Sequence, residues 1–307
     1  MPIWVLSHLL KKGESMRTFV LGTDWGADSD DAVAVRLLAR AHKKGEIRLV
    51  GIGINCVGEH SYASMRAYLE NEGVEIPVGL DTHTLTLDWR ETYQLRLASY
   101  RPDLENEMAD TAVCVYRRAI AECEGKVEIA EVGFLQVLAD LIKSEGDDIS
   151  PKNGIELMRE KVSHVWIMGG KWDEEGGKEF NLSAHPLAAE SAALVAEKCP
   201  VPITFLGFEI GAGVITGDRL PKEDMLKTAL IDHGCPYGRE SWDPMLAMLA
   251  MSGDPNAIGY DTVCGRATVD PRTGANFFCE EAGGPHRYVK KREADSFYTD
   301  PINASIA

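Results

Sequence analysis

The sequence predicts a single-domain α/β protein with a mostly parallel, open β-sheet, helices on both sheet faces and a small C-terminal β-hairpin. From residue 16 to about residue 252, short β-rich runs alternate with longer helical ones, and this order requires crossover connections between parallel strands. The β-rich runs are almost continuously apolar, as expected for a sheet covered on both faces. A chain of 307 residues with 45% hydrophobic content can also bury a large core.

The elements follow from hydrophobic periodicity and turn residues. Strands are expected at residues 18–21, 47–54, 78–80, 127–132, 164–168 and 203–206. Helices are expected at residues 32–38, 61–70, 110–122, 135–143, 187–198 and 244–251. Beyond residue 251 the order changes, because runs 262–269 and 275–279 flank a turn sequence at 270–274 that is typical of a hairpin. Residues 16–307 are therefore expected to form the domain, with residues 1–15 as an accessory N-terminal segment.

The charge balance excludes several classes of partner. Acidic residues outnumber basic ones by 48 to 32, which gives a net charge of -16 and repels nucleic-acid polymers and anionic membranes. Seven cysteines are scattered without a CxxC spacing, which favours a reducing cytoplasm over a disulfide scaffold or a zinc knuckle. The first residues lack a signal-peptide cleavage site and form too short a run to span a bilayer.

Four aspartates occupy eight consecutive positions between the first strand and the first helix: Asp24, Asp28, Asp30 and Asp31. Carboxylates this close repel one another unless a cation neutralises them, and hard oxygen ligands suit Ca²⁺ or Mg²⁺. The alternative is a helix N-terminus rich in acids, since Asp30 is a good N-cap. Capping needs one or two carboxylates, so we favour a metal site. It would lie at the carboxyl ends of the strands, where parallel sheets bind ligands.

The same segment resembles the aspartate-rich signature of the inosine-uridine preferring nucleoside hydrolases, in a form two residues longer. Further segments are similar to that family in the family's order: residues 132–136 (VGFLQ), 168–170 (MGG), 179–181 (EFN) followed by Pro186, and 241–244 (SWDP). The similarity extends from about residue 19 to residue 250, and it implies the nucleoside hydrolase fold.

The resemblance also implies roles for individual residues. One Ca²⁺ would be bound by Asp24, Asp31, Asp243 and the backbone carbonyl of Gln136, with Asp24 also acting as the general base toward the attacking water. Substrate would be held by Asp30 at a ribose hydroxyl and by Glu179 and Asn181 at the 5′ side of the sugar. Simpler alternatives stay open, because Asp243 also suits the N-terminus of the helix at Pro244, and Glu179 and Asn181 also suit an exposed polar loop.

Four positions depart from the family pattern. Gly22 replaces the first aspartate of the signature, Glu59 replaces a ribose-contacting asparagine with Asn55 slightly upstream, and His185 stands where aspartate is common. The family histidine that activates the base is Trp242 here, and indole cannot act as a general acid. Trp242 either stacks on a planar leaving group or packs in the core, Trp25 is a second stacking candidate, and His185 and Glu209 are candidate acids.

These observations give three functional hypotheses. The first is Ca²⁺-dependent hydrolysis of the N-ribosidic bond of a nucleoside or related small-molecule riboside, by a homo-oligomer, dimer or tetramer, as the resemblance implies. The second is a ligand-binding or regulatory protein that keeps the ribose and metal site but has lost turnover, which Trp242 and Glu59 motivate. The third, a Mg²⁺-dependent phosphatase with an aspartate nucleophile, ranks lowest, because that chemistry needs two aspartates separated by one residue directly after the first strand, and residues 22–24 supply one.

Overall fold

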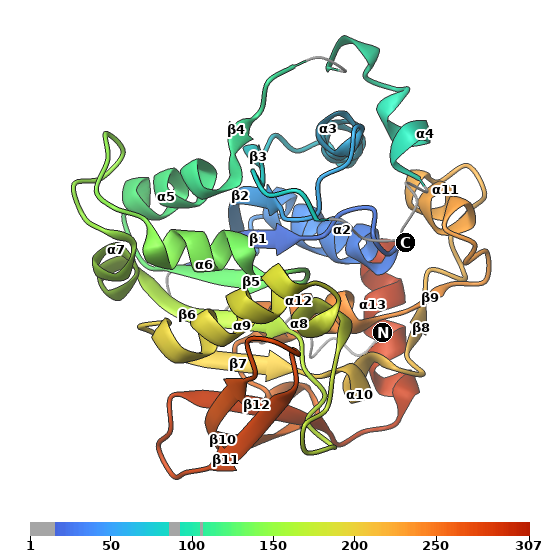
Figure 1. Cartoon of the computed structure of the whole chain (residues 1–307). Coiled ribbons are helices and arrows are strands. Elements are labelled where there is room, and N and C mark those ends of the chain that lie inside the picture. Colours follow the sequence, from blue (N-terminus) through green and yellow to red (C-terminus); the bar gives the residue numbers. More distant parts are fainter. Residues whose placement is uncertain (1–15, 86–92, 105–106) are drawn as a thin grey trace.

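The computed structural model describes residues 16–85, 93–104 and 107–307, and its centre is a ten-stranded sheet (Figure 1). The accessory segment expected at residues 1–15 lies outside the described residues. Seven neighbouring pairs in the sheet are parallel, and the two pairs that involve β10 are antiparallel. Across the sheet the strands are β11 (Asn276–Glu280), β10 (Tyr260–Val269), β12 (His286–Lys291), β7 (Ile203–Leu206), β6 (Val162–Met168), β5 (Val127–Glu131), β1 (Thr18–Thr23), β2 (Arg48–Ile54), β3 (Val78–Leu80) and β4 (Asp110–Thr111).

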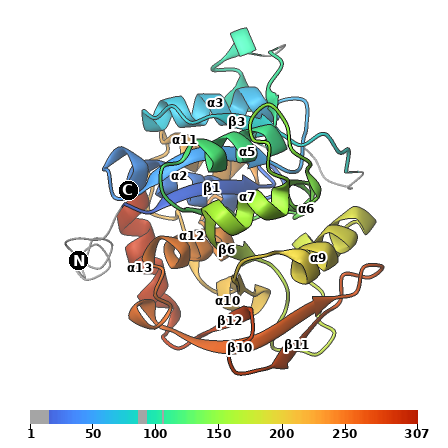
Figure 2. The same cartoon turned by 90° about the vertical axis from the view of Figure 1, so that its left-hand side faces the viewer.

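Helices cover both faces of this sheet, as the apolar strands predict (Figures 1 and 2). Each face has its own apolar core, and within β1 the side chains of Phe19 and Leu21 enter one core while Val20 enters the other. The first face carries α2 (Asp30–Lys43), α3 (Ser61–Glu72), α11 (Met225–Asp232), α12 (Trp242–Ser252) and α13 (Asp295–Ile306). The second carries α5 (Ala112–Glu122), α6 (Gln136–Lys143), α7 (Gly154–Lys161) and α9 (Pro186–Lys198).

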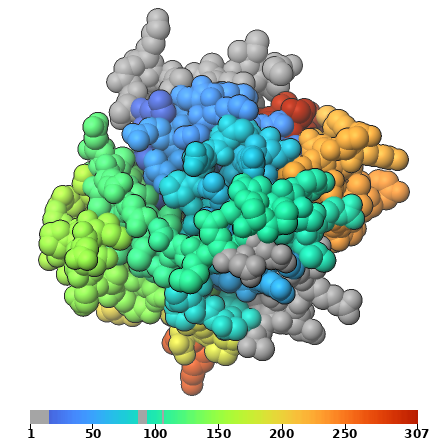
Figure 3. All heavy atoms as spheres, turned by 90° about the horizontal axis from the view of Figure 1, so that it is seen from above, coloured from blue at the N-terminus to red at the C-terminus, as the bar shows by residue number. Residues whose placement is uncertain are grey.

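Short elements fill the connections between these layers. They are α4 (Gln94–Ala98), α8 (Phe180–Ser183), α10 (Phe208–Gly211), the 3₁₀ turns η1 (Pro102–Leu104) and η2 (Asn256–Ile258), and the two-stranded sheet of β8 (Ile215–Thr216) and β9 (Arg239–Glu240). From above, α4 lies beside the segment that contains α11 (Figure 3), and an ion pair of 2.7 Å between Arg96 and Asp232 joins them. Among the described residues, no helix has the length and apolar character needed to cross a membrane.

Helix α2 is buried almost all round because it lies between the sheet and other helices. Its Arg36 is 1% exposed and bonds Glu72 at 2.7 Å and Asp224 at 2.8 Å. A buried guanidinium needs such partners, since its burial without them is strongly unfavourable. These ion pairs link α2 to α3 and α11, and they hold the helix that presents Asp30 and Asp31.

The predicted α/β class, the parallel sheet and the hairpin are confirmed. The hairpin of β10 and β11 is part of the main sheet, because β10 also pairs with β12, and β12 runs parallel to β7. The helix expected at residues 110–122 begins at Ala112, since residues 110 and 111 extend the sheet as β4. The sequence interpretation missed α7, α11, α13 and β12, whose apolar periodicity is weak or interrupted by polar residues.

Candidate active site

A cavity of about 300 Å³ opens at the carboxyl ends of the parallel strands. Its lining combines carboxylate side chains with aromatic ones, so that both a polar group and a planar ring of a ligand could find suitable contacts. Its lining consists of Asp24, Ala27, Asp28, Asp30, Asp31, Val132, Met168, Glu179, Phe180, Asn181, Phe208, Arg239, Trp242 and Asp243.

The fold brings the carboxylates together from two helix N-termini and one strand end. Asp24 follows β1, Asp30 and Asp31 form the first turn of α2, and Asp243 lies in the first turn of α12. The backbone N–H of Asp243 donates to Asp30 Oδ2 at 3.1 Å, which links the two helices. The Thr23 hydroxyl donates to Asp31 Oδ1. Both bonds orient carboxylates toward the cavity.

Burial and mutual repulsion dominate the electrostatics of this cluster. Oxygen atoms of Asp30, Asp31 and Asp243 lie within 4.8 Å of one another. Desolvation, followed by repulsion from neighbouring carboxylates, raises the pKa of each of these three groups well above its usual value. Desolvation and the charge of Asp28 raise the pKa of Asp24 to about 7. A bound cation would reverse these shifts, because it favours the ionised forms.

The cluster fits an oxygen-ligated divalent cation. Asp31 Oδ2 is buried and has no hydrogen-bond partner among the described residues, and a buried carboxylate oxygen without a partner is unfavourable. The side chains that could bind a metal here are all carboxylates, which suit Ca²⁺ or Mg²⁺. Asp30, Asp31 and Asp243 converge most closely, whereas the resemblance assigns Asp24 to the ligand set in place of Asp30. Asp24 lies on the same cavity wall.

Glu179 and Asn181 form the wall next to the strand ends. The Glu179 carboxylate accepts hydrogen bonds from the backbone N–H of Gly170 at 3.0 Å and of Asn181 at 2.8 Å, and burial raises its pKa to about 7. The Asn181 amide nitrogen donates to the carbonyls of Val132 at 3.1 Å and Met168 at 3.2 Å. These bonds fix both side chains, which are buried rather than part of an exposed loop.

Trp242 belongs to the aromatic part of the cavity. Its ring stacks on Phe208 with centroids 5.2 Å apart and planes inclined by 22°. Its indole nitrogen donates to the Phe208 carbonyl at 2.7 Å, and the Arg239 guanidinium lies 5.1 Å from its ring centroid. Trp242 is 8% exposed, and its ring both packs against the core and lines the cavity. Its stacking on a leaving group stays a prediction.

The sequence interpretation did not find Phe180, Phe208 or Arg239. Arg239 bonds Asp28 through two nitrogens at 2.9 and 2.6 Å, which joins β9 to the aspartate loop. Phe180 and Phe208 are 53% and 42% exposed, which is unusual for large apolar residues beside a cavity. The only available signal was their position, within the EFN motif and directly after the strand that ends at Leu206.

Some predicted residues lie outside the cavity lining of the described structure. The Asn55 side chain is buried and accepts from the Phe134 N–H at 3.1 Å, and Gln136 is buried with its amide donating to the Asn55 carbonyl. His185 Nδ1 accepts from the Leu187 N–H at 3.1 Å as the N-cap of α9. The Glu209 carboxylate accepts from the backbone of Trp172 at 3.3 Å. Neither candidate acid therefore lines the cavity.

Trp25 requires a correction as a stacking candidate. It is completely buried, its indole nitrogen donates to Ser64 Oγ at 2.8 Å, and its ring packs against Tyr68 and Tyr93. The ring turns inward because the adjoining cavity wall is acidic, while α3 offers an apolar site with a hydroxyl acceptor. Trp25 therefore anchors the aspartate loop and is not available to a ligand.

The structure also explains Gly22, which replaces the first aspartate of the family signature. Gly22 pairs with Glu131 on the adjacent strand β5, and a Cβ atom at position 22 would meet the Glu131 carboxylate at 1.7 Å. Glu131 accepts from the Tyr116 hydroxyl at 3.0 Å, and burial raises its pKa to about 8. A carboxyl group thus occupies this space from the neighbouring strand.

Comparison with known proteins supports the fold and gives no sequence match. No protein-family model and no curated protein matches the sequence. The structure is similar to the inosine-uridine preferring nucleoside hydrolase of Bacillus anthracis, with a TM-score of 0.66, 17% identity and coverage of 95% of this chain and 99% of that one. It is equally similar to an inosine-guanosine nucleoside hydrolase, with a TM-score of 0.66, 13% identity and coverage of 95% and 99%.

A third similar structure is the type III effector protein XopQ complexed with adenosine diphosphate ribose, with a TM-score of 0.69, 13% identity and coverage of 100% and 99%. These likenesses extend over whole chains in both directions. The protein therefore has the nucleoside hydrolase fold, which the sequence resemblance implies.

Proposed function

We propose that this protein is a Ca²⁺-dependent hydrolase of the N-ribosidic bond of a nucleoside or a related ribosylated small molecule. The observation that carries the proposal is one cavity whose lining combines four buried aspartates, the fixed side chains of Glu179 and Asn181, and the aromatic side chains of Phe180, Phe208 and Trp242. The nucleoside hydrolase fold is consistent with this chemistry. Fold alone does not define an activity, so the residues of the cavity have to support each step.

The aspartates would hold the cation. Asp31 and Asp243, together with Asp24 or Asp30, offer an oxygen set of the kind that Ca²⁺ prefers, and the resemblance adds the backbone carbonyl of Gln136. The bound ion would orient and acidify the attacking water. Binding would also remove the unfavourable burial of like charges that the cluster otherwise carries.

Asp24 would accept the proton of the attacking water. A general base has to be ionised to accept a proton. Burial and the charge of Asp28 raise the pKa of Asp24 to about 7, and a cation bound beside it would lower that pKa and keep the carboxylate ionised. Asp24 lines the cavity and is held by a turn in which its carbonyl accepts from the Ala27 N–H at 2.8 Å. The turn therefore fixes the backbone position from which the Asp24 carboxylate would reach the bound sugar.

The sugar end of the cavity would stabilise developing positive charge. Cleavage of a ribosidic bond passes through an oxocarbenium-like centre, which nearby carboxylates stabilise electrostatically. Asp30 would accept from a ribose hydroxyl, and Glu179 and Asn181 would contact the 5′ side of the sugar. Because Asn181 already donates through its amide nitrogen, its oxygen is the atom left to accept from the substrate.

The aromatic end would receive the leaving group. The stacked pair of Trp242 and Phe208 offers a planar surface, and aromatic rings bind one another in offset or tilted arrangements. Trp242 cannot donate a proton to the leaving group, and its indole N–H is already bonded to a carbonyl. The leaving group would therefore depart with little proton transfer from this wall.

The second candidate is a binding or regulatory protein without turnover. Trp242 and Glu59 motivate it, and one protein of this fold, XopQ, is known in complex with adenosine diphosphate ribose. The distinction between the candidates is the chemical step, since both would bind a ribosyl ligand at the same aspartates.

A reducing-sugar assay on a panel of nucleosides with Ca²⁺ tests the proposal. We expect ribose release by the parent protein and its loss in Asp24→Asn, while the surface variant Asp148→Asn keeps the parent rate. Calorimetric binding of a nucleoside or of adenosine diphosphate ribose without any ribose release would reject hydrolysis and favour the binding protein. Size-exclusion chromatography tests the expected homo-oligomer, and cell fractionation tests the expected cytoplasmic location.

A further inference from the structure

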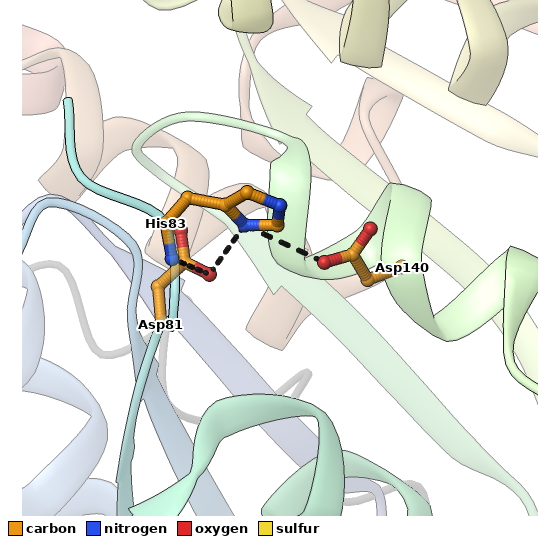
Figure 4. Close-up of side chains that lie close together, drawn as sticks. All are labelled: Asp81, His83 and Asp140. Carbon is orange, nitrogen blue, oxygen red and sulfur yellow. Dashed lines mark hydrogen bonds and ion pairs between the residues drawn. The ribbon is translucent and has the colours of Figure 1, made fainter.

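A second group of metal-binding side chains lies outside the cavity lining. Asp81 directly follows β3, His83 lies two residues further along the same loop, and Asp140 belongs to α6. Figure 4 shows the three side chains turned toward one another from these two elements. The hydrolase chemistry proposed above uses none of them.

The distances between these side chains are close to those between ligands of one ion. His83 Nδ1 lies 2.9 Å from Asp81 Oδ1 and 3.5 Å from Asp140 Oδ2, and one ligand atom of each residue lies within 4.8 Å of the others. Ligands about 2.0–2.2 Å from a tetrahedral Zn²⁺ are separated by roughly 3.3–3.6 Å. A small adjustment of three side chains would therefore place an ion between them.

The buried oxygen of Asp81 is an independent indication of a ligand. The Asp81 side chain is 2% exposed, and its Oδ1 atom accepts from the backbone N–H of His83 at 3.2 Å. Its Oδ2 atom is buried and has no hydrogen-bond partner within the described part of the chain. A charged oxygen buried without a donor is unfavourable, and an ion bound through Oδ2, or through both oxygens of this carboxylate, would remove that deficit.

The surroundings leave the other two ligands available. Lys143 bonds Asp140 Oδ1 at 2.6 Å, so that Oδ2 remains on the side of His83. The His83 side chain is 34% exposed, which gives an ion a route from solvent. Without an ion, the His83 ring lies between the two carboxylates, with Nδ1 facing an oxygen of each.

We propose that Asp81, His83 and Asp140 bind one Zn²⁺ or similar transition-metal ion, separately from the aspartates of the cavity. Imidazole is a ligand of Zn²⁺ and its neighbours in the transition series, whereas Ca²⁺ and Mg²⁺ prefer oxygen alone. One imidazole and two carboxylates leave a fourth position for water. The two sites therefore differ in metal preference because only one of them contains nitrogen.

The ion would have a structural effect next to the proposed active site. It would join the loop after β3 to α6, and α6 begins at Gln136, whose amide donates to the carbonyl of Asn55. Asn55 in turn accepts from the N–H of Phe134 at 3.1 Å. Metal binding would thus fix two strand-end loops on the same edge of the sheet.

Metal titration of the whole protein tests this proposal without measuring activity. The protein is first saturated with millimolar Ca²⁺, which fills an oxygen-only site, and is then titrated with Zn²⁺ and, separately, with Co²⁺ as a spectroscopic probe. We expect one equivalent of either ion to bind, with visible absorption bands of imidazole-bound Co²⁺. Absence of stoichiometric binding to the parent protein under these conditions would overturn the proposal.

Variants locate the ion. His83→Gln and Asp140→Asn, both at partly exposed positions, should weaken binding by about 100-fold or more, since each removes one of three protein ligands. His60→Gln removes a histidine from the N-terminus of α3 and should bind as the parent does. Unchanged Co²⁺ spectra in His83→Gln would place the ion elsewhere and refute the assignment. Far-ultraviolet circular dichroism of each variant verifies that the fold is retained.

Discussion

Replacing Asp31 by asparagine should show whether the aspartate cluster relieves the repulsion between its carboxylates by taking up protons or by binding a cation. The Asp31→Asn side chain would keep an oxygen that can accept from Thr23, as Asp31 Oδ1 does, but it would carry no charge. The parent cluster either takes up protons, as its raised pKa values indicate, or binds a cation. Because Asp31→Asn removes one charge, the remaining carboxylates repel less and need less proton uptake or cation binding.

The size of the effect follows from the spacing of the carboxylates. Two ionised groups 4.8 Å apart, the limit found for Asp30, Asp31 and Asp243, repel by roughly 3 kcal/mol at an effective dielectric constant of about 20. Since protonation already relieves part of this, we expect the metal-free variant to gain about 1–2 kcal/mol, or roughly 2–3 °C in Tm for a chain of this length. Ca²⁺ at 100 times its Kd should add about 2.7 kcal/mol to the parent protein.

Thermal unfolding with and without Ca²⁺ measures both quantities, with Asp148→Asn as a control for loss of one exposed aspartate. The parent and the control should gain about 4 °C with Ca²⁺, and Asp31→Asn should start higher and gain little. An equal Ca²⁺ shift in Asp31→Asn would remove Asp31 from the ligand set. The absence of a shift in the parent protein would mean that the cluster is not a cation site.

Three further outcomes are expected. Asp24→Asn should lower ribose release by about 100-fold or more at unchanged fold, the usual contribution of a general base, and a parent-like rate would exclude that role. Because Trp242 cannot protonate a leaving group, p-nitrophenyl riboside should be cleaved about 100-fold faster than inosine or uridine, whereas comparable rates would indicate an acid in the site. Burial raises the pKa of Glu131 from 4.5 to about 8, so between these values the folded protein holds a proton that the unfolded chain releases, and stability falls as pH rises. Glu131→Gln should reduce this fall by at most about 4 kcal/mol between pH 5 and 8 in denaturant titrations, and an unchanged pH dependence would show that Glu131 is not the group responsible.

The sequence predicted the parallel sheet well because its strands are short, apolar and regularly separated by helices. It predicted poorly where an element depends on distant partners. β12 reads as a polar segment, and it becomes a strand because β7 and β10 lie on either side of it. Helix α13 begins without a side-chain cap and contains Pro301, so local rules do not indicate it.

For the candidate site, residues next to strand ends were easier to predict than residues brought in by loops. The aspartate motif, Glu179, Asn181 and Trp242 all line the cavity. Arg239 and Phe208 were missed because their role depends on contacts with Asp28 and Trp242, which are far from them in sequence. The sequence also did not predict which way the Trp25 ring points, since this depends on the space beside Tyr68 and Tyr93.

Gly22 and Glu131 constrain each other's replacement, because the Glu131 carboxylate occupies the space that a side chain at position 22 would need. A Cβ atom at position 22 would lie 1.7 Å from the Glu131 carboxylate and 2.5 Å from the Tyr116 hydroxyl, so aspartate at position 22 requires the buried Glu131 side chain to move. Small residues at both positions would leave a gap between adjacent central strands and would remove the carboxylate that accepts from the Tyr116 hydroxyl. Replacing either residue alone should therefore destabilise the protein, and the two positions should show strong coupling in a double-mutant cycle.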